Sequence, residues 1–273
     1  MTTAAQHRRH WPRYLLAAAV LAGIAVWRDH QQQQRAEAVA HATQQKGGQV
    51  FSDTTLVEKV HRWCAGYPVN WKAGRMVTLF DAKLDSAWLQ EHDDLADLQI
   101  AYLHLGRSTV STNDALRLIA RQPLQNYSAR GQRDADTVAA ALAGKSRLTV
   151  VELAETDLTD AGLRRLPLEQ LEALFIEGTL VTTSGLSELR RCRVLTNVSI
   201  DAHQFDETVV SILAELPALE RVSLVGPGIR DENIMLITGL KKLPYLHLVG
   251  TSVTDVGAEK LSDAMPATVI GRE

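Results

Sequence analysis

A hydrophobic pattern recurs through the second half of the chain with a period of about 24 residues, within the range of known structural repeats. Each copy opens with a leucine, continues with two apolar residues at alternate positions and closes with apolar residues at helical spacing. The opening leucines are Leu148, Leu171, Leu195, Leu219 and Leu243. Chance does not hold such a register over this distance, and the spacing therefore predicts a stack of similar structural turns.

The same period extends toward the N-terminus. One period before Leu148 is Leu124, and one period before Leu124 is Ile100. One more copy, slightly out of step, begins at Val77. We therefore predict a repeat domain of about eight turns over residues 74–273.

The pattern within one turn predicts a strand followed by a short helix. Apolar residues at alternate positions bury one face of a strand, and the later apolar residues return at helical spacing. Thr159-Asp160 and Thr254-Asp255 are suited to the N-caps of such helices. One turn cannot bury both elements, so adjacent turns must stack. The expected fold is an α/β solenoid of stacked strand–helix turns.

The N-terminus resembles a membrane-targeting segment. Residues 1–13 form a basic leader, residues 14–27 are uncharged, and Trp11 to Trp27 is 17 residues with one charge, which is close to the minimum for a spanning helix. We predict a transmembrane signal anchor at 14–27, with a cleavable signal peptide as the alternative. The charges around it favour a single-pass protein whose repeat domain lies on the non-cytoplasmic side.

The residues between this segment and the repeats divide into two parts. Residues 28–46 are rich in Ala and Gln, which predicts a solvated helical stalk, or a flexible linker as the alternative. Residues 47–73 hold two of the five tryptophans. Because the end turn of a solenoid must cover its open core, we predict an N-terminal cap there; a ligand pocket built from these aromatic residues is the alternative.

These features together resemble a known family. The spacing L-x-x-L-x-L with this period is similar to the leucine-rich repeat. The basic leader, the hydrophobic segment, the stalk and repeats such as 250–257, Gly-Thr-Ser-Val-Thr-Asp-Val-Gly, resemble the short membrane-anchored leucine-rich-repeat proteins of planctomycete bacteria. The resemblance covers nearly the whole chain. It implies a leucine-rich-repeat solenoid with a curved parallel sheet on its concave side and short helices on its convex side. It also implies a binding scaffold and says little about an activity.

Composition and motifs argue against several function classes. The net charge of −3 provides no basic field for nucleic acid, and Cys64 and Cys192 are too far apart in sequence for a zinc motif or a disulfide-rich module. We expect both cysteines to be buried core residues. The acidic run at 91–97, which contains His92, lacks metal-ligand spacing and is interpreted as a solvated loop. No nucleophile and base are jointly identifiable, so we expect no enzyme, cofactor or metal.

The candidate site is the predicted concave face, onto which the residues between the buried strand positions point. Its two columns contain sixteen residues, and in addition to the ten below they hold Met76, Thr78, Asn126, Ser128, Ser199 and Ser223. The predicted partner-binding residues are Tyr102, His104, Val150, Glu152, Ala173, Phe175, Asn197, Arg221, Tyr245 and His247. An apolar centre with a polar rim is typical of a site for a protein or a cell-envelope component. The alternatives are a solvated face without a ligand and a structural envelope protein that associates with itself.

Overall fold

The computed structural model describes residues 11–45, 49–51, 75–78, 87, 91, 100–106, 110–240 and 242–272. Within these residues one ten-stranded sheet runs the length of the repeats, with its strands in the order of the sequence. Strand β1 is antiparallel to β2, and all later neighbours are parallel. The strands are β1 (Gln49–Phe51), β2 (Arg75–Thr78), β3 (Ile100–His104), β4 (Asn126–Ser128), β5 (Val150–Glu152), β6 (Ala173–Phe175), β7 (Asn197–Asp201), β8 (Arg221–Val225), β9 (Tyr245–Val249) and β10 (Val269–Arg272).

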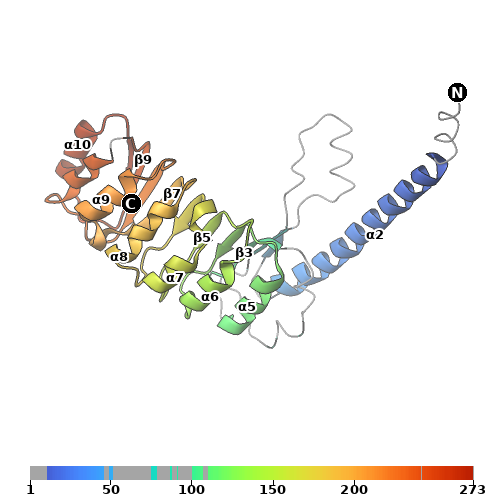
Figure 1. Cartoon of the computed structure of the whole chain (residues 1–273). Helices are drawn as coiled ribbons and strands as arrows, with labels where there is room; N and C mark the ends of the chain where they lie inside the picture. Colours follow the sequence, from blue (N-terminus) through green and yellow to red (C-terminus); the bar gives the residue numbers. More distant parts are fainter. Residues whose placement is uncertain are drawn as a thin grey trace, which may run out of the picture.

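From β3 to β10 short helices connect successive strands, and they lie together along one side of the sheet (Figure 1). The α-helices are α2 (Trp11–Gln44), α5 (Thr112–Arg121), α6 (Ala135–Leu142), α7 (Asp160–Arg165), α8 (Thr183–Leu186), α9 (Glu207–Ala214) and α10 (Asp255–Ala264). The 3₁₀-helices are η2 (Leu168–Gln170), η3 (Ser187–Arg191), η4 (Ala202–Gln204) and η5 (Ile234–Gly239). A 3₁₀-helix rises further per residue than an α-helix, so it crosses the helical side of a turn with fewer residues.

The predicted repeat register is confirmed by the strand pairing. Val151 lies beside Leu174 and Leu174 beside Val198, and all three side chains are buried between the sheet and the helices. The helical positions follow the same rule, since Leu163 and Leu186 are also buried. Parallel strands that repeat in register and are joined by short helices fit a leucine-rich-repeat-like solenoid. Strands β1 and β10 extend the sheet beyond the eight predicted turns.

Aspartates connect neighbouring turns on the helical side. Thr159 and Thr254 are the N-caps of α7 and α10, as predicted. In several turns an aspartate near the start of the helical segment accepts two hydrogen bonds, through its carboxylate, from the threonine of the following turn. Such pairs among the described residues, with distances to the threonine amide and hydroxyl, are Asp136–Thr159 at 2.8 and 2.6 Å, Asp160–Thr182 at 2.7 and 2.8 Å, and Asp231–Thr254 at 2.9 and 2.6 Å. Asp255 instead accepts a hydrogen bond from the guanidinium of Arg272.

The N-terminal segment forms one continuous helix, α2, of 34 residues. The transmembrane helix predicted at 14–27 is not supported, because no helix in the described part of the chain is both long and apolar enough to cross a membrane. Fourteen helical residues extend only about 21 Å, short of a hydrocarbon core of about 30 Å. Arg13 and Arg28 flank this uncharged run, and the helix continues into the polar residues beyond.

The end of α2 differs from the solvated stalk that the sequence predicts. Val39 and Thr43 are buried, and Val39 belongs to the hydrophobic core of the repeats, with Ala42 packed against it. The hydroxyl of Thr43 donates to the carbonyl oxygen of Val39 at 2.7 Å, which satisfies the buried hydroxyl within the helix. The last turns of α2 therefore cover part of the core. The cap predicted at 47–73 lies outside the described residues, apart from β1 at 49–51.

Candidate functional site

The strand register places all ten predicted site residues in two columns across the sheet. We call the sheet face that carries these columns, turned away from the repeat helices, the open face. In the first column lie Tyr102, Asn126, Val150, Ala173, Asn197, Arg221 and Tyr245, each paired with the next. The second column holds His104, Ser128, Glu152, Phe175, Ser199, Ser223 and His247 in the same way. Met76 and Thr78 extend the two columns onto β2.

Exposure along the open face is uneven. Arg221 is exposed and Tyr245 is 44% exposed, whereas Val150 and Phe175 are half-buried. Ala173 is only 7% exposed, so it adds little surface to the apolar centre that the sequence predicts. The reason is its size: a methyl group lies level with the backbone while larger neighbours project beyond it. Phe175 and Val150 therefore provide most of the apolar surface at the centre.

On one side of the apolar centre, β5 carries an acidic group. The hydroxyl of Ser128 donates to Oε2 of Glu152 at 2.6 Å, which fixes the orientation of that carboxylate. Burial lowers the pKa of His104, and the nearby charge of Glu152 opposes this shift. The hydroxyl of Tyr102 donates to Oε1 of Gln125 at 3.4 Å.

On the other side of the apolar centre, β8 carries a basic group. The guanidinium carbon of Arg221 lies 5.0 Å from the centre of the Tyr245 ring, which is the geometry of a cation–π interaction. This contact crosses from β8 to β9 within the first column. On β10, a β-carbon at Gly271 would contact the imidazole of His247 closely, so glycine there leaves room for that ring. Arg221 and Tyr245 thus form a fixed pair on an exposed surface.

A second charged group lies just beyond the ends of β4, β5 and β6, and sequence reasoning missed it. Arg130 contacts Glu177 at 3.1 Å and Glu155 at 3.4 Å, and the Glu177 side chain is only 10% exposed. Glu155 has a positive φ of 57°. Among the residues that the structure describes, the buried Nε of Arg130 and Oε2 of Glu177 have no hydrogen-bond partner. The repeat spacing could have predicted this pair. Arg130 and Glu177 each lie two residues after the second column, at equivalent positions of their turns, and their charges are opposite.

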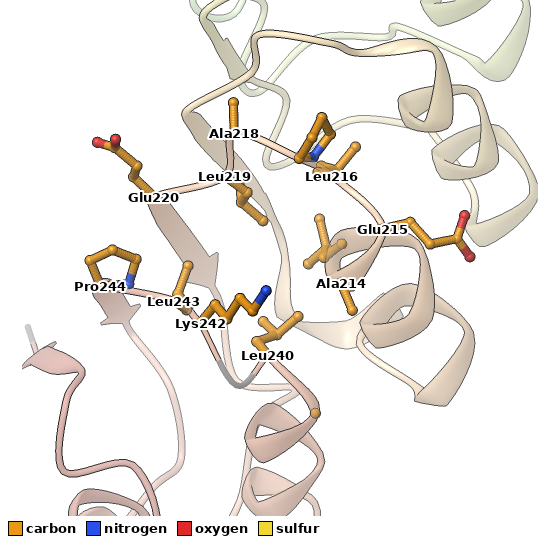
Figure 2. A pocket seen from close by; sticks show the side chains of 13 residues that line it. Ala214, Glu215, Leu216, Ala218, Leu219, Glu220, Leu240, Lys242, Leu243 and Pro244 are labelled. Carbon is orange, nitrogen blue, oxygen red and sulfur yellow. The ribbon is translucent and has the colours of Figure 1, made fainter.

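The structure also contains a cleft at the N-terminal ends of β8 and β9 (Figure 2). The charged group around Arg130 lies instead beyond the C-terminal ends of its strands. The volume of the cleft is about 510 Å³, and its lining comes from residues 213–220, 239–240 and 242–244. Figure 2 shows Lys242 among the apolar lining residues, while Glu220 points outward from the start of β8. Leu216, Leu240 and Leu243 in this lining are core residues. The cleft therefore lies between two turns and is separate from the open face.

The two cysteines and the acidic run were the other residues considered for chemistry. Cys192 is buried in the hydrophobic core, as predicted, and burial raises its pKa to about 12, which disfavours the reactive thiolate. Cys64 lies outside the described residues, as does the acidic run at 91–97 apart from Glu91, which is exposed. Across the described parts of the chain, no group of three or more His, Cys, Asp and Glu side chains is placed to hold a metal ion.

Comparison with known proteins adds little to this geometry. No family model matches the chain, and no curated protein matches it. Among solved structures, the chain is similar to the crystal structure of a TLR13-ssRNA13 complex, with a TM-score of 0.37 and 17% sequence identity. The match covers 62% of this chain and 28% of the TLR13 chain. Our description of the fold therefore rests on the strand register.

Proposed function

We propose that this chain is a binding scaffold whose open face takes a protein or a cell-envelope component. The observation that carries the proposal is the pair of in-register columns, on the side of the sheet away from the repeat helices, with a half-buried apolar centre and polar residues around it. Interfaces are typically built with such a centre and rim, and Tyr, Phe and Arg are enriched in them. We further propose that the scaffold binds without catalysing a reaction.

Substitutions at two positions of the open face test the proposal. Phe175→Asp places a charge at the apolar centre, and Tyr245→Ala removes both an exposed ring and the support of Arg221. We expect each variant to lose a partner that cross-links to the wild-type chain in native membranes and co-purifies with it. Met235→Ala is the matched control, because Met235 is also 44% exposed but lies in η5 on the helical side.

The outcomes separate binding from folding. Circular dichroism and thermal melting should show the same fold in all three variants, because none of the three side chains is fully buried. If Phe175→Asp and Tyr245→Ala keep the fold and also keep the partner, the open face is not the binding surface. If the purified chain recovers no partner and instead forms a concentration-dependent oligomer through this face, it is a self-associating structural protein.

For the N-terminal helix we propose attachment to a membrane, with the repeat domain on the non-cytoplasmic side. Support comes from the uncharged run 14–27 and from the exposure of Ile24, Val26 and Trp27 on α2, since apolar side chains on an exposed helix favour contact with lipid. Carbonate extraction of membranes should leave the chain in the pellet, and protease added outside the cytoplasmic membrane should digest the repeats. Release of a shortened chain into the supernatant would instead indicate a cleaved signal peptide.

A further inference from the structure

The open face carries two formally charged side chains among its described column residues, and their charges are opposite. Glu152 lies on β5 and Arg221 on β8, at the two borders of the apolar centre. Within the described part of the chain, no carboxylate forms an ion pair with Arg221, which stacks on the ring of Tyr245. Glu220, its neighbour in sequence, lies at the rim of the cleft and points outward from the start of β8. Both charges are therefore available to a ligand.

The separation of these charges follows from the sheet. Strands β5 to β8 are consecutive, so three strand spacings of about 4.8 Å place Glu152 and Arg221 about 14 Å apart across the sheet. The two-residue offset between their columns increases this to about 16 Å. An extended peptide rises about 3.4 Å per residue, so residues i and i+4 are about 14 Å apart and point to the same side. The separation on the sheet is thus about 2 Å longer than the separation on the peptide, and long charged side chains can cover this difference.

Resting on the proposed function above, we propose that the open face binds an extended peptide segment with an acidic residue and a basic residue four positions apart. The acidic side chain binds the guanidinium of Arg221, and the basic side chain binds the carboxylate of Glu152. Residue i+2 of the peptide lies over the middle of the face, between β6 and β7. There Phe175 projects beside Ala173 and Ser199, which are 7% and 3% exposed, and an apolar side chain at i+2 packs against the ring.

The two charged residues are already oriented for this task. Stacking on Tyr245 holds the Arg221 guanidinium while its N–H edges stay available for a carboxylate, which they bind in a bidentate manner. On the other side, the Ser128 hydroxyl occupies one position on Oε2 of Glu152, and an ionised carboxylate accepts further hydrogen bonds. Pre-orientation reduces the entropy that each side chain loses on binding.

The proposal is tested by fluorescence anisotropy with labelled peptides and the purified full chain. The probe contains Glu-Thr-Leu-Thr-Arg between Gly-Ser flanks, and the spacing control moves Arg one position closer to Glu. We expect saturable binding of the probe below about 1 mM and binding of the spacing control at least about tenfold weaker, since the control directs its two charges to opposite sides of an extended chain. Equal binding of the two peptides overturns the proposal, as does the absence of binding to either.

A charge exchange identifies the contact. Arg221→Glu should weaken binding of the probe by at least about tenfold and should bind a peptide with Arg-Thr-Leu-Thr-Arg more tightly than the wild-type chain does. Arg230→Glu is the matched control, because Arg230 is an exposed arginine outside the columns, and it should bind the probe like the wild type. If Arg221→Glu leaves probe binding unchanged while Phe175→Asp still loses the cellular partner, the open face remains the site and the peptide class is wrong.

Discussion

The carboxylate of Asp160 occupies the space that a β-carbon on Gly185 would need. Asp160 belongs to α7 and Gly185 to α8 of the next turn, and the same carboxylate accepts hydrogen bonds from the amide and hydroxyl of Thr182. The relationship recurs between Asp136 and Gly162 and between Asp231 and Gly257. The glycine of the Thr-x-x-Gly pattern therefore makes room for the aspartate of the preceding turn.

Gly185→Ala should destabilise the repeats. The added methyl group displaces the Asp160 carboxylate from Thr182, and we expect the free energy of unfolding in urea to fall by about 1–3 kcal/mol. Once Asp160→Ala has removed that carboxylate, Gly185→Ala should cost much less, so the double variant should be only slightly less stable than Asp160→Ala alone. Additive losses in this double-mutant cycle would show that Gly185 is required for some reason other than the carboxylate.

Leu174→Asp should disrupt the core. Leu174 is fully buried on β6 between Val151 and Val198, and its replacement would bury an unpaired carboxylate among apolar side chains. A loss of about 4 kcal/mol or more is expected, with unfolding of adjacent turns in thermal melting followed by circular dichroism. The matched control is Leu180→Asp in the same turn, where the leucine is 62% exposed and the melting temperature should hardly change. A Leu174→Asp variant that melts like the wild type would contradict the register.

Stability should decrease in mild acid because of His104. Burial lowers its pKa below the ordinary value of 6.5, and the charge of Glu152 counters only part of that shift. Below about pH 6.5 the unfolded chain therefore binds more protons at this position than the folded chain, so the free energy of unfolding falls as the pH falls toward the folded-state pKa. Urea denaturation at about pH 7.5 and about pH 5.5 should show a smaller loss for His104→Gln than for the wild type. His203→Gln, which removes an exposed histidine, should keep the wild-type loss.

The period of the leucines was enough to predict the strands from β2 to β9 and their register, whereas β1 and β10 were not predicted. Val151, Leu174 and Val198 follow one another at the repeat spacing, and parallel strands that bury such residues can stack in only one alignment. The same alignment places Glu152 beside Phe175, and Arg221 beside Tyr245, from the spacing alone. The binding of a partner to these residues is still a prediction, because the arrangement of side chains in columns does not identify the ligand.

Periodicity did not predict contacts that join different turns. The bridge from Arg130 to Glu177 spans 47 residues of sequence and two strand spacings, and it depends on how side chains cross β5. The sequence also presented residues 28–46 as a polar stalk, whereas the fold buries Val39 against the first turns of the core. Val39 is the one large aliphatic residue of this segment, whose other apolar residues are alanines, and only the docking of α2 makes it a core residue.

The sequence by itself determined the architecture, because the apolar positions recur in every turn. A turn of this length buries its apolar faces by stacking against the neighbouring turns. The sequence also determined which side chains share the open face. Only the tertiary structure decided that Asp160 serves the following turn, that Ser128 orients Glu152 and that Tyr245 supports Arg221. These interactions depend on the distances between neighbouring turns. The packing of the core sets those distances, and the sequence of a single repeat does not specify them.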